Sequence, residues 1–198
     1  MLHAVALALA LMGVQHVTPL PFQDIDMLAE AVFVGRVVSV QPLGRPKNDV
    51  RIVTFRVKRA IRGEVQVGKM LRVMQYAPFA PNVVPGEDLL WYLPKASNMD
   101  LASPVGLLSG SFRIRTSLSG TTAINDVNNE LLWGAGKKLW DTYPKEEVRK
   151  VLLARRNNPK LLADAMQAGD KVGNPGPVPL ELLLALTGMK PVPIPQAR

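Results

Sequence analysis

The stretch AVFVGRVVSV, residues 31–40, decides the fold class of this chain. Six of its ten residues are β-branched or aromatic, and residues of these types favour strands. Gly35 lies in the middle of the run, and a glycine inside a strand indicates a bulge or a tight bend. Because such bends curl a sheet, the stretch predicts one strand of a curved sheet.

Similar patterns recur along the chain as far as residue 124. Residues 51–59 alternate between an apolar face, which includes Phe55, and a polar face, which includes Arg56. Residues 88–93 are apolar on both faces, which predicts a central strand that is covered on both sides. Further strands are predicted around 70–74, 111–115 and 121–124, separated by loops rich in proline and glycine. Five or six short strands of this kind favour a small antiparallel barrel or sandwich over residues 22–135.

The pattern changes from period two to period 3.6 near Trp140, which indicates helices. Residues 140–170 are predicted to form a helical hairpin, in which Pro144 opens the first helix and Asn158 caps the second. Residues 171–198 are predicted to contain a linker, an apolar helix over 180–186 and a proline-rich tail. The chain is thus expected to be mainly β with a C-terminal helical appendage.

The first 17 residues resemble a signal peptide. An unbroken apolar run over 4–14 is too short to span a bilayer but suits the apolar region of such a leader. A buried N-terminal helix and a misplaced start codon are the alternatives. No other apolar run is long enough to span a membrane, so we expect a secreted or periplasmic protein without a transmembrane segment.

The residue types that carry most enzyme chemistry are missing after the leader. The chain has no cysteine, and both histidines, His3 and His16, lie within residues 1–17. This removes the commonest general base, the commonest metal ligand and the only thiol nucleophile. We therefore predict no catalytic residue, no metal site and no cofactor. An enzyme that relies on carboxylates such as Glu87 or Asp126 is the remaining enzymatic alternative.

Two polar regions have structural interpretations. The serines between residues 103 and 119 have no histidine to activate them and are interpreted as turn and cap residues. The run over 125–130 is rich in oxygen donors but lacks the glycine and the ligand register of a calcium loop. We interpret it as a turn stabilised by its own asparagine and aspartate side chains.

Positive charge is concentrated in one part of the chain. The net charge is +8, and ten lysines and arginines lie between residues 36 and 72, where the acidic residues are Asp49 and Glu64. A field of one sign predicts an anionic partner, either an acidic polymer or an anionic surface. Specific nucleic-acid binding is not expected, because the phenylalanines on these strands share a face with valines and should point into the core. The predicted binding residues are Arg51, Arg56, Lys58, Arg59 and Arg62.

Residues 24–133 resemble the netrin-like, TIMP-like OB-fold domains, including those of uncharacterised secreted bacterial proteins. The segments that carry the resemblance are DMLAEAVFVGRVV (26–38), VTFRVKRAIRG (53–63), PGEDLLWYL (85–93), PVGLLSGSFRI (104–114) and AINDVNN (123–129). The resemblance implies a five-stranded, partly open Greek-key barrel. Animal TIMPs inhibit metalloproteinases through an N-terminal cysteine, and this chain has no cysteine, so the resemblance supplies no mechanism.

Two functions are consistent with these observations. The first is an exported, non-enzymatic module that binds a macromolecular or anionic partner. The alternative is a structural subunit that docks onto an extracellular or envelope complex through its C-terminal helices. The apolar run over 180–186 motivates this alternative, since so narrow a polar face is hard to leave in water.

Overall fold

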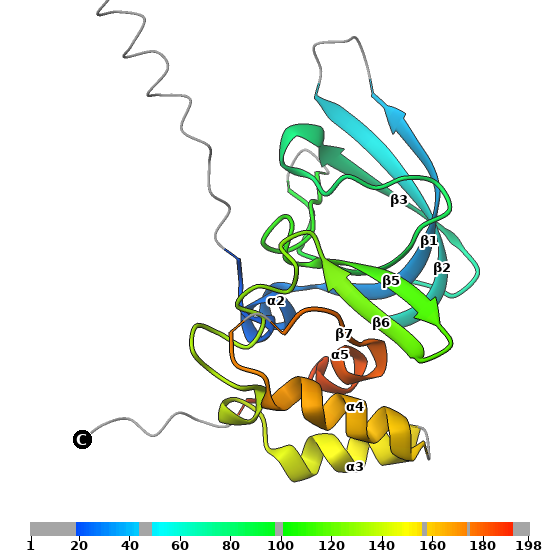
Figure 1. Ribbon diagram of the computed structural model, residues 1–198. Coiled ribbons are helices and arrows are strands. Elements are labelled where there is room, and N and C mark those ends of the chain that lie inside the picture. The colour runs from blue at the N-terminus through cyan, green and yellow to red at the C-terminus, as the bar shows by residue number, and fades with distance from the viewer. Residues whose placement is uncertain (1–18, 44–48, 98–100, 156–157, 174, 192–198) are drawn as a thin grey trace, which may run out of the picture.

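The computed structural model describes residues 19–43, 49–97, 101–155, 158–173 and 175–191, so the predicted leader and the last seven residues lie outside the described part. The described chain contains one seven-stranded antiparallel sheet with the order β3-β2-β1-β4-β5-β6-β7 (Figure 1). The strands are β1 (Ala31–Pro42), β2 (Val50–Arg62), β3 (Met70–Tyr76), β4 (Asp88–Leu93), β5 (Ser111–Ser117), β6 (Gly120–Asn125) and β7 (Val178–Pro179). The predicted mainly β class is confirmed.

The sheet is open, with β3 and β7 at its two ends, so closure into the predicted barrel is not shown. It also has one more strand than the five or six expected, because Val178 and Pro179 of the predicted linker pair with Ala123 and Thr122. A two-residue strand that ends in proline has no alternation from which a sequence pattern could reveal it.

The bend predicted at Gly35 is confirmed by the pairing of β1 with β2. The register shifts between Val34 and Gly35, where Lys58 is the extra residue on β2. A Cβ atom on Gly35 would lie 3.0 Å from a ring carbon of Phe33 and 3.2 Å from the Cβ of Phe55. A side chain at this position would therefore press on two buried phenylalanines, which favours glycine here.

Replacing Gly35 with valine is expected to lower the free energy of unfolding by about 1–3 kcal/mol, because the added methyl groups must displace two buried phenylalanines. Replacing it with alanine should have a smaller effect in the same direction. Urea unfolding followed by tryptophan fluorescence measures both. Equal stability of wild type and the valine variant would show that the strands do not pack this closely.

Within the described residues, four α-helices accompany the sheet: α2 (Phe22–Leu28), α3 (Lys145–Arg155), α4 (Pro159–Asp170) and α5 (Leu180–Leu186). Two short 3-10 helices, η1 (Ala77–Phe79) and η2 (Leu139–Asp141), lie in the connections. The predicted cap of α4 is confirmed, since the Asn158 side chain accepts hydrogen bonds from the backbone N–H groups of Lys160 and Leu161, both at 3.1 Å. The predicted helical hairpin corresponds to α3 and α4.

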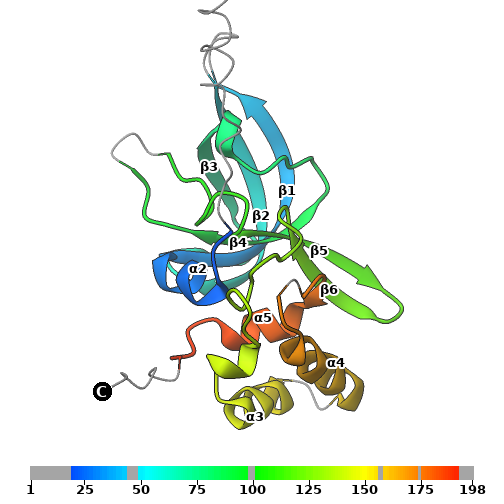
Figure 2. The same cartoon turned by 60° about the vertical axis from the view of Figure 1, so that its left-hand side comes forward.

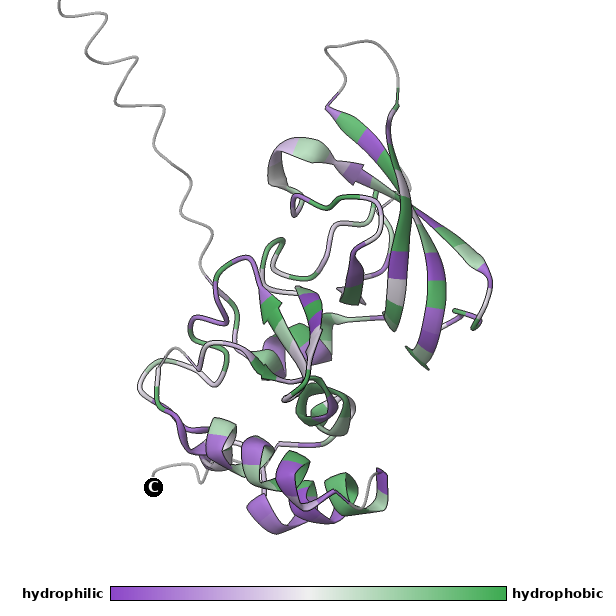
Figure 3. Ribbon diagram, turned by 45° about the vertical axis from the view of Figure 1, so that its right-hand side comes forward, coloured by the Kyte–Doolittle hydropathy of each residue, from purple (hydrophilic) through white to green (hydrophobic). Residues whose placement is uncertain are grey.

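Strand β4 is covered on both faces, as predicted. Leu90 and Tyr92 point into a helix-side core that they share with α2, α3, α4 and α5. Leu89 and Trp91 point the other way, into a strand-side core with Phe33 and other residues of β1, β2 and β3. The bands of opposite hydropathy along β2 and β3 reflect the same alternation (Figure 3).

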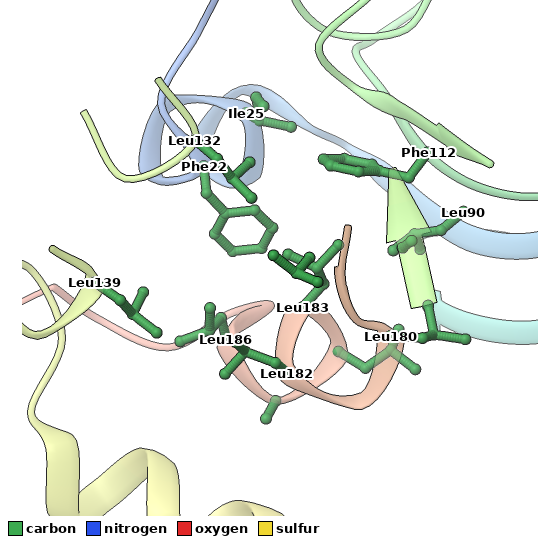
Figure 4. Packing of buried hydrophobic residues seen from close by; sticks show 14 of the residues in the cluster. Phe22, Ile25, Leu90, Phe112, Leu132, Leu139, Leu180, Leu182, Leu183 and Leu186 are labelled. Atoms are coloured by element: carbon green, nitrogen blue, oxygen red, sulfur yellow. The ribbon is translucent and has the colours of Figure 1, made fainter. Parts of the chain in front are cut away.

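Helix α5 lies at the centre of the helix-side core. All seven of its residues are buried, and it lies between the β5–β6 hairpin and the pair α3 and α4 (Figures 1 and 2). Leu183 points toward Phe22, while Leu182 and Leu186 extend from the same helix into the surrounding side chains (Figure 4). The hydroxyl groups of Tyr92 and Thr187 are 2.8 Å apart and join the end of α5 to β4. The apolar helix is therefore covered by its own chain.

Candidate functional site

The five predicted binding residues lie on β2, but they do not form one patch. Arg62, the last residue of β2, donates hydrogen bonds to the Asp26 carboxylate at 2.7 Å and to the carbonyl oxygens of Asp26 at 2.6 Å and Ala29 at 3.1 Å. The other Asp26 carboxylate oxygen accepts from the Gly188 N–H group at 2.8 Å. Arg62 and Asp26 therefore tie together α2, β2 and the segment after α5.

Arg59 also faces the helical layer. Its guanidinium lies 2.9 Å from the carboxylate of Glu181, a buried residue in the first turn of α5. The bulge at Lys58 explains this placement, because one extra residue in β2 brings Arg59 opposite Val34, which faces the helix-side core. Arg59 thus supplies the positive charge beside a buried acid, and it is a structural residue in this arrangement.

Arg51 lies on the opposite face of β2, which it shares with Val53. Its guanidinium donates to the side-chain oxygen of Gln75 at 3.2 and 3.3 Å and to the carbonyl oxygen of Pro81. Burial lowers the pKa of this guanidinium from its ordinary value. Arg51 holds the loop after β3 against the sheet. It therefore does not lie with the outward-facing cations among which it was grouped from the sequence.

The remaining two residues, Arg56 and Lys58, have exposed side chains. Arg56 pairs with Arg36 of β1 on one side and with Met70 of β3 on the other. Arg36 in turn lies opposite Asp88, the first residue of β4. A row of side chains therefore crosses four strands on one face of the sheet.

Asp88 is the one carboxylate in this row. It accepts two parallel hydrogen bonds from Arg36, both at 2.9 Å, and it lies 2.8 Å from the ammonium group of Lys58. The hydrogen bond from Arg36 is the main cause that holds the pKa of the Asp88 carboxyl below its usual range; partial burial opposes it, and the Lys58 hydrogen bond adds to it. Asp88 is thus a charged anchor that orients two cations.

Arg56 and Arg72 have no such anchor. Both side chains are exposed, and neither has an ion pair with any residue in the described part of the chain. Arg72 lies opposite Thr54 on β2, diagonally next to Arg56 and on the same face of the sheet. We name this surface the strand face and define it by five residues: Arg36, Arg56, Lys58, Arg72 and Asp88. It has four cations and one acid. Arg36 and Arg72 are not among the binding residues predicted from the sequence.

The pH dependence of the free energy of unfolding tests the contacts of Asp88 with Arg36 and Lys58. Since the pKa of Asp88 is lower in the folded chain than the value of about 3.9 in an unfolded one, its contribution to stability is fully present above about pH 5. That contribution is lost as the pH falls through the folded pKa. We expect the stability difference between wild type and Asp88→Asn to be constant near neutral pH and to shrink below pH 4, as urea titrations would measure. A difference independent of pH would contradict these contacts.

The carboxylates considered for catalysis are held by one arginine. Arg113 donates to Glu87 at 3.2 Å and forms an ion pair with Asp126. It also bonds to the carbonyl oxygen of Asn82. This arrangement fixes the loop before β4 to the end of β6 and leaves each carboxylate with a positive partner.

The polar run after β6 forms the predicted turn. The side-chain oxygen of Asn129 accepts from the Asn125 backbone at 3.0 Å, and that of Asn125 accepts from the Asn129 backbone at 2.6 Å. Ser109 and Ser111 have structural roles as well, since they accept hydrogen bonds from the Leu20 backbone at 3.1 Å and from the Trp91 indole at 2.6 Å. The described residues contain no group of three or more acidic, histidine or cysteine side chains that could hold a metal ion.

A groove of about 510 Å³ lies between the tip of the β5–β6 hairpin and α4. Its lining mixes hydroxyl, amide and charged groups, among them Thr121, Lys160 and Asp164, and the Arg59–Glu181 ion pair also borders it. No local sequence pattern predicts this groove, because it forms between segments that are far apart in the sequence. Its mixed charges do not select one ligand class.

Comparisons with protein-family models and with curated proteins find no match for this chain. Among the described residues, no helix has the length and apolar character needed to cross a membrane.

Proposed function

We propose that this chain is an exported, non-enzymatic binding domain that recognises an anionic macromolecule through the strand face. The observation that carries the proposal is the pair Arg56 and Arg72, two exposed guanidinium groups on neighbouring strands that form no ion pair with any described residue. Guanidinium groups form short, paired hydrogen bonds with carboxylates, sulfates and phosphates. Arg36 and Lys58, oriented by Asp88, add two cations to the same surface.

A rigid support also favours binding at this surface. The opposite side of the same strands is packed by Phe33, Phe55 and Trp91, whose rings lie 4.5–6.5 Å apart between centroids. Side chains that project from such a support lose less conformational freedom on binding than side chains on a loop. The composition agrees with a binding role, because the chain has no cysteine and both its histidines precede residue 17.

The strand order supports an OB-like, netrin-like interpretation of the fold. Strands β4-β1-β2-β3 follow the spatial order of a Greek key, in which the fourth strand returns to lie beside the first. A parallel bridge between Met74 and Leu101 lies on the outer edge of β3 and brings the segment before β5 toward it. We propose a partly open barrel of this type. We also propose that the leader directs export of the protein to the periplasm or the medium.

The structural-subunit alternative loses its motivation. It was based on the apolar helix α5, and all seven residues of this helix are buried within the chain itself. We therefore retain the binding domain as the proposed function.

A salt titration tests the proposal. Fluorescence anisotropy would measure the affinity for heparin, poly-L-glutamate and anionic lipid vesicles between about 50 and 500 mM salt, a range over which screening of exposed charges becomes strong. We expect binding at low salt and a steep, linear loss of log affinity with log salt concentration. Absence of binding to all three probes at low salt would overturn the proposed function.

A further inference from the structure

The outer edge of β3 is the feature beside the strand face that has no assigned role. The Val57 N–H group donates to the Lys69 carbonyl oxygen at 3.0 Å, so this carbonyl group faces β2. The Met74 carbonyl oxygen accepts from Ala102 at 2.8 Å, so the groups of Met74 face away from β2. Because these directions alternate along a strand, the backbone groups of Met70 and Arg72 also face away from the sheet.

With respect to the described residues, these outward groups form an open edge. In the described part of the chain, the bridge at Leu101 and Ala102 reaches Met74, and no backbone partner meets Met70 or Arg72. Both residues are exposed, with Met70 at 50% of its full accessibility. An exposed edge with unpaired N–H and C=O groups is a template for one more strand.

The charges around this edge indicate which kind of strand can pair with it. Lys69 and Arg72 lie on the edge strand or next to it, and Arg56 lies diagonally behind Arg72. A second copy of this chain paired along the same edge would bring these cations face to face, which is unfavourable. An acidic segment would instead place carboxylates opposite them.

We infer that the strand face and the β3 edge form one site, which accepts an extended acidic segment of a partner protein as an additional strand. Every second side chain of such a segment lies over the strand face, where a glutamate or aspartate can reach Arg56 and Arg72. The backbone groups of the segment pair with those of Met70 and Arg72. This inference rests on the proposed function and adds the chemical class of the partner.

The first test compares peptides of equal charge on the wild-type chain. The probe is a capped, fluorescent octapeptide that alternates glutamate and threonine, together with two versions N-methylated at either all glutamates or all threonines. Loss of two hydrogen bonds should weaken one methylated peptide by about tenfold or more. The glutamate-methylated version is affected if the added strand is antiparallel, and the threonine-methylated version if it is parallel.

The second test removes the edge donor and retains every cation. Met70→Pro deletes the outward N–H group at the start of β3, a position where proline is tolerated on an edge strand, and Met70→Ala is the matched control. We expect the proline variant to bind the octapeptide about tenfold more weakly, with heparin affinity unchanged, and the alanine variant to behave like wild type.

The outcomes separate this inference from the proposed function. If all three peptides bind equally and Met70→Pro binds the octapeptide like wild type, strand addition is overturned while anion binding stands. If neither heparin nor any peptide binds at low salt, the proposed function itself fails. The peptide comparison uses the wild-type chain, so it remains decisive even if the proline variant does not fold.

Discussion

Replacing Leu183 with alanine is expected to lower the free energy of unfolding by about 2–5 kcal/mol, the range for a fully buried leucine. The side chain is 0% exposed and lies in the helix-side core, close to Phe22 (Figure 4). Its truncation leaves a cavity in the core shared by the sheet and the C-terminal helices. Urea unfolding of the two proteins measures the effect.

Leu118→Ala is the matched control for this prediction. Leu118 lies at the tip of the β5–β6 hairpin and is fully exposed, so the same change should alter stability by less than about 0.5 kcal/mol. Comparable effects at the two positions would contradict the buried position of α5. A change of oligomeric state in Leu183→Ala, without loss of stability, would instead support the structural-subunit alternative.

Reversing two charges on the strand face is expected to have the largest effect on function. The double variant Arg56→Glu/Arg72→Glu should bind heparin at least about tenfold more weakly at low salt, and the slope of log affinity against log salt should fall by about 2. Asp88→Asn should act in the opposite direction, because it removes the one carboxylate that holds Arg36 and Lys58. Anisotropy titrations at several salt concentrations measure both effects.

The control for net charge is the double variant Lys137→Glu/Lys150→Glu. Both lysines are exposed and lie outside the strand face, Lys150 on α3 and Lys137 before η2. The control has the same net charge as the strand-face variant, so it should retain most of the affinity. Equal losses in the two double variants would show that binding depends on overall charge and not on this surface.

The strands and helices could be predicted because their signals are local. Alternation identified β2, and apolar residues on both faces identified β4 as a central strand. Gly35 indicated the bend in β1, and Asn158 indicated the start of α4. Each of these features depends on residues that lie close together in the sequence.

The candidate site could be predicted only in part, because the role of each cation depends on partners that are distant in the sequence. The sequence shows the cations of β2, but the acids that neutralise them, Asp26, Asp88 and Glu181, come from other segments as far as 122 residues away. The bulge at Lys58 also shifts Arg59 to the helical side, which simple alternation cannot indicate. Neither effect leaves a local pattern in the sequence.

The most direct measurement is an amide chemical-shift map of the protein titrated with a heparin oligosaccharide at low salt. We expect the shifts to concentrate on β1, β2 and β3 around Arg36, Arg56 and Arg72, with α3 and α4 unchanged. Shifts that concentrate instead on the groove between the β5–β6 hairpin and α4, or that spread evenly over all exposed lysines and arginines, would contradict it.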